Sequence, residues 1–535
     1  MLSYRKLAMR VLGRPLHTEG IDSPRPASQR AAAFILTAAM LTTLAAPAFA
    51  DIWHIENGDI TISAGESGNN VTQNNNTTYG DTNTIITNQN KDTASSHTVT
   101  IEAKDKDDKV EVTLKDVNID TSSRNKAAVS VTGEGDTNIK LDGDNALKSD
   151  IYRSGIYGSG SLTISGGEND SLTAQGGSGA NGISSSGSLT ISGGTVTANG
   201  DDGGRGISSS GSVTISGGST VTANGGSGTI SGGDGIWSGG GVTISGGSTV
   251  TANGGNGGSL VGGDGIRSGG GLTVSDGTVT AKGGNGDSKD GYGGDGIRSG
   301  GVVTISGNTV NAAGGYGGKV GGYGICSFDR VAISGGTVEA AGGNGSTGGG
   351  SGIYSSVIDL SGSLELTAKA GSPNGKALSQ KGSELVLDTI KDKLGPGAKV
   401  TATDADGKVI DQVSTPRPVE PEESSSSSDG GSAAPSAPAS PLPGLTVTDK
   451  DGQRISYTST QSGNTLTVCV GRLTASFRIS LAALRQLRAE GIDTITFQTI
   501  LCSTTLSVDE LLAMGGEDAE AVLTHRFTDS SLTVG

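Results

Sequence analysis

The chain has few aromatic residues, and this scarcity excludes a wide hydrophobic core. Only 3% of its 535 residues are Phe, Trp or Tyr, and the hydrophobic fraction is 32%. Glycine contributes 93 residues, far above the share of roughly 7% in an average protein. Such a composition cannot fill the interior of several ordinary globular domains. It can fill a narrow core that repeats along one axis.

Cysteine and positive charge are also scarce. The chain has three cysteines, Cys326, Cys469 and Cys502, which are too few for a disulfide scaffold. Cys469 and Cys502 either form a disulfide or are two buried thiols, and the sequence does not decide between these states. The 38 Lys and Arg residues face 54 Asp and Glu residues, which gives a formal net charge of −16. This charge excludes nucleic acid and anionic membrane surfaces as partners, and it is compatible with neutral sugars or bound Ca²⁺.

One uncharged apolar run lies near the N-terminus and predicts a secretory signal. Arg25 and Arg30 precede the run at 31–46, and a small-x-small pattern ends at Ala50. The run is slightly short for a membrane span, which disfavours a membrane anchor. We therefore predict a signal peptide over 1–50, a secreted protein and no membrane insertion after cleavage. Retention at a cell surface stays open.

The organising feature of the sequence is an internal repeat of about 28 residues. Each unit opens with Gly-Ile, continues with a Val/Leu-Thr-Ile segment, turns at Ser-Gly-Gly and ends in a Val-Thr-Ala segment. The period of two and the β-branched residues predict strands, and the density of glycine excludes helices. The isoleucines of the Gly-Ile pairs are Ile156, Ile183, Ile207, Ile236, Ile266, Ile297, Ile325 and Ile353.

These repeats predict a mainly β fold, a right-handed parallel β-helix over 51–413. Each strand is too short to be stable alone, so it must pair with its copy in the next turn. The spacing varies only between the third strand and the next Gly-Ile, so the insertions should lie along one edge. Asn199, Asn224 and Asn253 should form a ladder. An Asn/Thr-rich stretch at 69–90 interrupts the first turns, which must hide an open strand edge.

A change of composition separates a second domain. Residues 414–443 are rich in Pro, Ser, Glu and Ala and predict a disordered linker. Residues 444–535 predict a small α+β domain with a helix over 480–490. We find no catalytic constellation in it, and we expect His525 and Asp509 to be surface residues.

An acidic position recurs two residues before the Gly-Ile isoleucine, where Asp234, Asp264 and Asp295 stand. Stacked carboxylates repel one another unless they are solvated or bridged by a cation. Ca²⁺ takes six to eight oxygen ligands. The pattern therefore makes Ca²⁺ a candidate cofactor with these three ligands, and a solvated acidic ridge of turn residues is the alternative.

The position after the same isoleucine predicts a ligand-binding face, because alternation along a strand points it outward. An aromatic ring packs on the apolar face of a sugar, and guanidinium groups grip carboxylates. Trp237, Arg267 and Arg298 are therefore the candidate ligand-binding residues. The alternative is that the two arginines only pair with nearby aspartates. The whole set is Tyr157, Ser184, Ser208, Trp237, Arg267, Arg298, Cys326 and Tyr354.

Repeats of the form Gly-Ile-x-Ser-x-Gly-x-Val-Thr-Ile-Ser-Gly-Gly-x-Val-Thr-Ala, behind a signal peptide, resemble the clostridial secreted carbohydrate-binding parallel β-helix family. The resemblance covers 52–413. It implies a solenoid like that of pectate lyases, binding of cellulose or acidic polysaccharides, and calcium sites. Its motifs mostly specify architecture, so the resemblance transfers fold better than function.

Together these features predict a non-catalytic extracellular protein that binds a polysaccharide, with calcium as a candidate aid. One alternative is a surface adhesin or stalk that displays the C-terminal domain. A pectate-lyase-like polysaccharide lyase is the other, and it is disfavoured because Arg267 and Arg298 are repeat copies and no histidine lies in the repeats. No catalytic residue is assigned.

Overall fold

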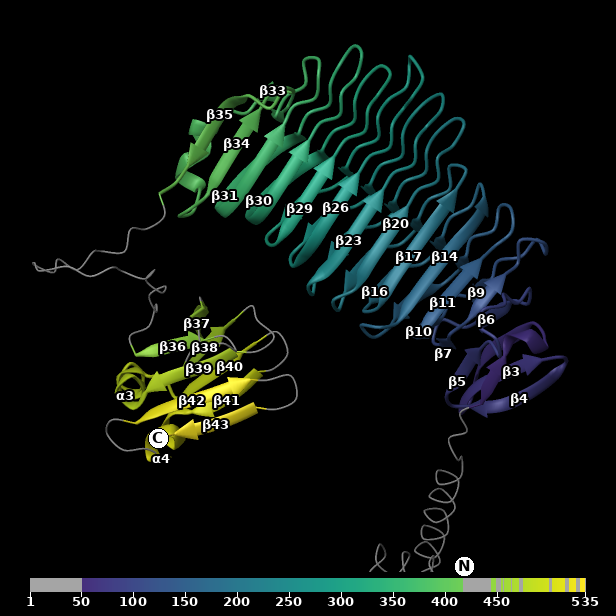
Figure 1. Ribbon diagram of the computed structural model, residues 1–535, viewed down its shortest axis with the longest axis horizontal. Coiled ribbons are helices and arrows are strands. Elements are labelled where there is room, and N and C mark those ends of the chain that lie inside the picture. The colour runs from purple at the N-terminus through teal and green to yellow at the C-terminus, as the bar shows by residue number, and fades with distance from the viewer. Residues whose placement is uncertain are drawn as a thin grey trace, which may run out of the picture. The chain divides into compact units, whose positions relative to one another are not determined.

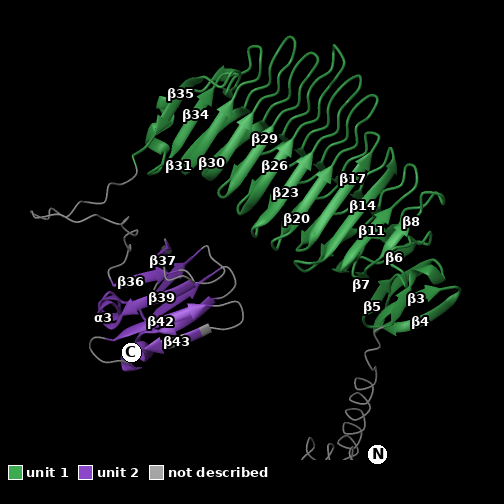
Figure 2. Cartoon of the chain, in the orientation of Figure 1, with its two compact units in different colours: residues 1–421 green, residues 422–535 purple. Residues whose placement is uncertain are grey.

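The computed structural model describes residues 51–416 and, further on, 444–448, 454–455, 457–462, 464–470, 475–499, 503–514, 519–525 and 530–534. The chain divides into two compact units, Met1–Pro421 and Glu422–Gly535 (Figure 2). The predicted signal peptide and most of the predicted linker lie outside the described residues. Strands make up 54% of the structure and helices 6%. In the described part of the chain, no helix has the length and apolarity needed to cross a membrane.

The first unit is a parallel β-solenoid of about 13 turns spaced by about 28 residues, which confirms the predicted fold. Each full turn contributes one strand to each of three rows, and the strands of a row pair with their copies in neighbouring turns. One of these rows is visible as a run of successive arrows in Figure 1. A period of two along every strand sends alternate side chains to the interior.

The first row holds the strands that open with Gly-Ile. Ile236 pairs with Ile266, and Ile266 pairs with Ile297, as the repeat predicts. The row consists of β2 (Ile60–Gly65), β6 (Val99–Ala103), β9 (Val129–Gly133), β12 (Ile156–Gly158), β15 (Ile183–Ser185), β18 (Ile207–Ser209), β21 (Ile236–Ser238), β24 (Ile266–Ser268), β27 (Ile297–Ser299), the first parts of β30 (Ile325–Ala341) and β31 (Ile353–Lys369), and β32 (Leu378–Gln380).

The second row holds the Val/Leu-Thr-Ile strands. It ends at the serine positions, and Ser165, Ser192 and Ser216 lie in register there. The row consists of β1 (Ile52–His54), β5 (Thr84–Thr87), β7 (Lys109–Lys115), β10 (Asp136–Asp142), β13 (Ser161–Ser165), β16 (Leu189–Ser192), β19 (Val213–Ser216), β22 (Val242–Ile244), β25 (Leu272–Val274), β28 (Val303–Ile305) and the middle parts of β30 and β31.

The third row holds the Val-Thr-Ala strands. Asn224 donates to Asn199 and Asn253 donates to Asn224, each at 2.8 Å, so the predicted asparagine ladder is confirmed. The row consists of β8 (Asn118–Asp120), β11 (Asp144–Lys148), β14 (Ser171–Ser178), β17 (Thr195–Asp201), β20 (Thr220–Asn224), β23 (Ser248–Asn253), β26 (Gly277–Lys282), β29 (Thr309–Ala313), the last parts of β30 and β31, and β34 (Lys399–Thr403).

The core of the solenoid is narrow and built from small and β-branched side chains. One continuous cluster of buried Ile, Val, Leu and Ala residues runs from Ile55 to Val413. The three rows enclose it, and none of the Phe or Trp residues that the structure describes is among its buried members. The small number of aromatic residues in the chain therefore agrees with a core that is too narrow to need them.

Atypical strands close both ends of the solenoid. At the N-terminal end, the stretch predicted as an insertion forms β3 (Gly68–Gln73) and β4 (Asn76–Asp81). Strand β3 pairs antiparallel with β2, and β4 pairs antiparallel with β3. At the C-terminal end, β35 (Val409–Ser414) pairs antiparallel with β34. Two short 3-10 helices, η1 (Ile55–Asn57) and η2 (Leu387–Lys393), and the strand β33 (Ser383–Glu384) complete the unit. Such ends hide the open strand edges, as predicted.

Glycine-rich loops lie between the third row and the next first-row strand, and they line up along one edge of the solenoid (Figure 1). We call the loops 225–235, 254–265, 283–296, 314–324 and 342–352 the glycine fin. Its outgoing and returning legs are joined directly by backbone hydrogen bonds: Gly284 N–H donates to Gly263 O and Gly294 N–H to Gly284 O, at 2.8 and 2.9 Å. A methyl group on Gly263 would overlap the carbonyl oxygen of Gly233. The fin therefore needs glycine for close approach, whereas Gly217 and Gly218, with φ of 68° and 72°, supply positive φ at a corner.

The second unit contains two four-stranded sheets and two helices in its described residues. Its core includes Phe477 and Phe497, whose ring centroids lie 5.3 Å apart. One sheet holds β36 (Leu445–Thr448), β39 (Ala475–Ser480), β42 (Glu520–His525) and β43 (Ser530–Val534), the other holds β37 (Thr458–Ser462), β38 (Thr465–Cys469), β40 (Thr494–Gln498) and β41 (Ser503–Ser507), and the helices are α3 (Leu481–Ala489) and α4 (Val508–Met514).

Two expectations for the second unit have different outcomes. Asp509 is exposed, as expected, and pairs with Arg488 at 2.8 Å. His525 is fully buried, so its assignment to the surface was wrong. Strand alternation in β42 turns the imidazole inward, where it contacts the Thr504 hydroxyl at 2.9 Å, and burial lowers its pKa. Cys469 is half-buried and Cys502 lies outside the described residues.

Candidate functional site

The residues that follow the buried isoleucines form one outward row along the first strand row. Trp237 pairs with Arg267, and Arg267 pairs with Arg298, so the three candidate ligand-binding residues occupy consecutive turns. We call the outward row the set of paired positions Thr100, Ser130, Tyr157, Ser184, Ser208, Trp237, Arg267, Arg298, Cys326 and Tyr354.

The exposure of the outward row is uneven. Trp237 is half-buried, and the side chains of Arg267 and Arg298 are 48% and 39% exposed. Ser208 and Cys326 are buried, which strand alternation alone did not predict. Burial raises the pKa of the Cys326 thiol to about 12, so this cysteine is not a nucleophile.

Arg205 contacts both the indole of Trp237 and the carboxylate of Asp234. Its guanidinium carbon lies 4.4 Å from the centre of the Trp237 ring, and its Nε lies 3.2 Å from Asp234 Oδ2. This cation–π contact fixes the indole on the outward row. Sequence reasoning missed Arg205, although it stands two residues before Ile207, at the same repeat position as the three aspartates.

The three aspartates form a buried row, with exposed fractions of 6, 5 and 4% for Asp234, Asp264 and Asp295. One oxygen of each carboxylate accepts the backbone N–H of the equivalent residue in the next turn. These bonds run from Asp264 N to Asp234 Oδ1, from Asp295 N to Asp264 Oδ1 and from Tyr323 N to Asp295 Oδ1, at 2.9, 2.7 and 2.7 Å. The aspartates are therefore backbone acceptors that tie the turns together. The alternative of a solvated acidic ridge was wrong, because the fin and the arginines cover this row.

Burial makes two of these carboxylates hard to ionise, and repulsion from neighbouring carboxylates adds to this effect at Asp264. Burial, followed by the carboxylates of Asp295 and Asp234, raises the pKa of Asp264 to about 8. Burial also raises the pKa of Asp295 to about 6, although the N–H of Tyr323 and the charge of Arg298 act in the opposite direction.

The arginines compensate the buried row only in part. Arg298 Nη1 lies 3.4 Å from Asp295 Oδ2, whereas Arg267 Nη1 lies 4.0 Å from Asp264 Oδ2. Each arginine therefore faces an aspartate, as the alternative expects, and also keeps a large exposed fraction. Its role in ligand binding stays a prediction.

The side chains of the aspartate row do not form a calcium donor set as they lie. Oδ1 of each carboxylate already accepts a backbone N–H, and Oδ2 faces an arginine. In the described residues, no three Asp, Glu, His or Cys side chains converge as a metal site would need. Ca²⁺ requires six to eight oxygens, so we derive no step through it.

The calcium site that the sequence predicts at this row can be tested by a titration. We expect CaCl₂ and a chelator to leave the unfolding temperature of the full chain unchanged, because the donor oxygens are already occupied. Differential scanning calorimetry checks this result. A calcium-dependent rise that disappears in Asp264→Asn would instead establish the site.

A groove of about 620 Å³ lies at the N-terminal end of the outward row. Its lining includes Tyr157 and Ser184 of the outward row together with Tyr152 and Arg153 from the loop after β11. Sequence reasoning noted Tyr157 but not the groove, because Tyr152 and Arg153 stand in a loop without repeat periodicity. Two aromatic residues close together in so aromatic-poor a chain were the available signal.

Comparison with protein-family models, curated proteins and solved structures returned no match for this chain.

Proposed function

We propose that the protein binds a polysaccharide along the outward row and performs no chemistry on it. The observation that carries the proposal is the register that sets Trp237, Arg267 and Arg298 side by side on consecutive turns, each with an exposed part. A linear glycan presents one similar ring after another. A solenoid presents one equivalent position after another, at about 4.8 Å per turn. Successive sugar rings can therefore lie along successive turns of the solenoid.

The chemistry of the row suits a sugar better than a nucleic acid. An indole offers an apolar face to the C–H groups of a sugar ring, and a guanidinium donates paired hydrogen bonds to hydroxyls or carboxylates. The net charge of −16 opposes nucleic acid. Ser184, which lies between Tyr157 and Trp237 in the row, adds a small hydroxyl partner. Secretion and a surface location belong to the proposal and rest on the sequence alone. Calcium has no place in it, because the oxygens of the aspartate row already have partners.

Trp237→Ala is expected to weaken binding of the full chain to its polysaccharide by at least about tenfold, because aromatic anchors supply a large part of such contacts. A panel of immobilised plant and host polysaccharides identifies the ligand, and biolayer interferometry gives the affinities. Tyr79→Ala is the matched control, since Tyr79 is 77% exposed on β4, away from the outward row.

Three outcomes separate the alternatives. Equal binding by Trp237→Ala, Arg267→Ala and the unchanged chain would contradict the outward row and favour a stalk whose C-terminal unit binds. Release of unsaturated sugars, seen as ultraviolet absorbance, would favour a lyase. No retention on any glycan would count against a carbohydrate ligand altogether.

A further inference from the structure

The groove at the N-terminal end of the outward row has a lining unlike the rest of the molecule. Its charged lining residues are Lys126 and Arg153, and no carboxylate lines it, although the chain as a whole carries a net charge of −16. Most of its other lining residues carry a hydroxyl or an amide, among them Asn125, Ser130 and Ser184. A local positive charge in an acidic protein attracts an anion to that place.

The nearest carboxylates are already engaged. Asp59 binds both terminal nitrogens of Arg124, at 2.7 and 3.2 Å, and also accepts the Thr98 N–H and Lys126 Nζ. Burial opposes ionisation of Asp59, but these donors hold its pKa well below the usual range. Arg124 and Lys126 together carry two positive charges against the single negative charge of Asp59, so this cluster keeps a net positive charge beside the groove.

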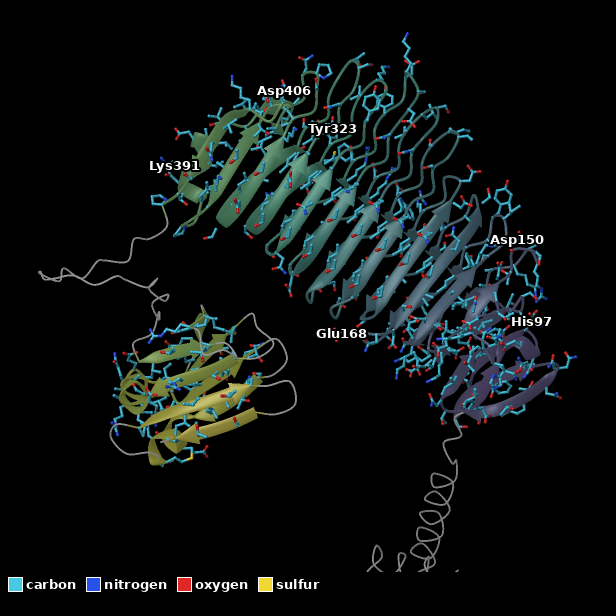
Figure 3. All side chains as sticks on the ribbon, viewed as in Figure 1. His97, Asp150, Glu168, Tyr323, Lys391 and Asp406 are labelled. Carbon is cyan, nitrogen blue, oxygen red and sulfur yellow. The ribbon has the colours of Figure 1, made fainter. Side chains whose placement is uncertain are left out.

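The second nearby carboxylate belongs to Asp150, which lies with His97 at the N-terminal end of the solenoid (Figure 3). It accepts the backbone N–H groups of Asn125 and Ile151, at 2.5 and 2.7 Å. Arg153 donates from Nε to Asn125 Oδ1 at 3.3 Å rather than to this carboxylate. The guanidinium of Arg153 is therefore held at the groove by a neutral partner and keeps its charge available.

The two tyrosines supply the apolar surface of the groove. Tyr157 is 43% exposed on β12, and Tyr152 is 79% exposed in the loop after β11. Tyr152 has a φ of 59°, an uncommon conformation for a residue with a bulky side chain. Its ring lies against Gly179, where a methyl group would come within 2.9 Å of the ring. Backbone conformation and a neighbouring glycine thus hold an exposed ring beside the cations.

We propose that this groove binds a carboxylate-bearing sugar, a uronate residue of the polysaccharide. A tyrosine ring carries the apolar face of the sugar, the hydroxyl and amide side chains bind its hydroxyls, and Arg153 with Lys126 binds its carboxylate. The inference rests on the proposed function and adds a separate site that holds the carboxylate of the sugar. Tyr157 lies three turns before Trp237, about 14 Å along the axis, so one oligosaccharide can reach both.

The test compares an oligouronate with the same oligomer after reduction of its carboxyl groups to alcohols, by isothermal titration calorimetry on the full chain. Arg153→Ala is expected to weaken binding of the oligouronate by about tenfold, the cost of one charge-assisted hydrogen bond, and to leave the reduced oligomer unchanged. Tyr157→Ala is expected to weaken both ligands. Arg330→Ala, at an exposed arginine on β30, is the matched control.

The outcomes separate this inference from the proposed function. If Trp237→Ala weakens both oligomers while Arg153→Ala changes neither, the uronate site is wrong and the outward row stands. If the unchanged chain binds the reduced oligomer as tightly as the oligouronate, the uronate site is also wrong. If the chain binds neither oligomer nor any immobilised glycan, both proposals fall. A preference for a sulfated neutral oligomer over the oligouronate would overturn the assignment to a carboxylate.

Discussion

Replacing Gly350 by alanine is expected to lower the free energy of unfolding by about 3 kcal/mol, the cost of forcing extra atoms into a packed interior. Gly350 lies in the returning leg of the last loop of the glycine fin. Its N–H donates to Gly343 O at 2.8 Å, and its own carbonyl accepts from Gly371 N–H at 2.8 Å. A methyl group there would overlap the carbonyl oxygen of Gly322, and backbone cannot rotate aside as a flexible side chain can.

Gly348, two residues earlier in the same leg, provides the matched control. A methyl group on Gly348 would meet the two methyl groups of Val320 at 3.8 Å, an ordinary van der Waals contact. Gly348→Ala is therefore expected to raise the free energy of unfolding by about 0.5 kcal/mol, because alanine has less freedom in the unfolded chain. The two Gly→Ala substitutions are therefore expected to change the free energy of unfolding in opposite directions.

Urea unfolding followed by circular dichroism measures both variants, and hydrogen exchange by mass spectrometry locates the change. The expected loss of protection in Gly350→Ala includes 314–324 and 342–352, because each turn of a solenoid is stabilised chiefly by its neighbours. Equal urea midpoints for the two variants would show that the legs of the fin are not in direct backbone contact.

The solenoid could be predicted from the sequence because its signal is repeated. A period of two along each strand fixes which residues face inward, and a constant spacing fixes the register between turns. Ile236, Ile266 and Ile297 therefore had to coincide, and the outward positions of Trp237 and Arg267 followed from them. Neither conclusion needed knowledge of any contact beyond the repeat.

The burial of the aspartates could not be predicted in the same way. A repeat position tells which residues stack, but it does not tell what covers the stack. Asp264 is covered because two glycine legs meet without side chains between them and because Arg267 folds back towards it. That close approach depends on backbone hydrogen bonds between loops, which leave no periodic pattern other than glycine itself.

The groove could not be predicted from the sequence for a different reason. Asn125 and Tyr152 stand in the irregular early loops and adopt φ values of 52° and 59°. Positive φ in residues other than glycine has no reliable signature in sequence. The side chains that meet in the groove come from positions that no alternation rule relates, so only the folded chain brings them together.

Asp264→Asn is expected to stabilise the protein at pH 8, by about 1–4 kcal/mol, the range seen when buried charged groups are replaced by neutral ones. The pKa of Asp264 rises from 3.8 to about 8 on folding, so between these values the folded chain holds a proton that the unfolded chain has released. The contribution of Asp264 to the free energy of unfolding is fully present below pH 3.8 and is lost as the pH rises towards 8.

The amide at position 264 keeps the structural role of the carboxylate while removing its charge. Asn181, three turns earlier in the same row, already shows this arrangement, since its Oδ1 accepts the N–H of Arg205 at 2.8 Å. Asp264→Asn should therefore flatten the fall of the urea midpoint between pH 5 and 8. Asp264→Ala should lower the midpoint at both values, by about 1–3 kcal/mol, because the N–H of Asp295 then loses its acceptor. A midpoint in Asp264→Asn that falls with pH as steeply as in the unchanged chain would show that this carboxylate ionises normally and that the buried row is solvated.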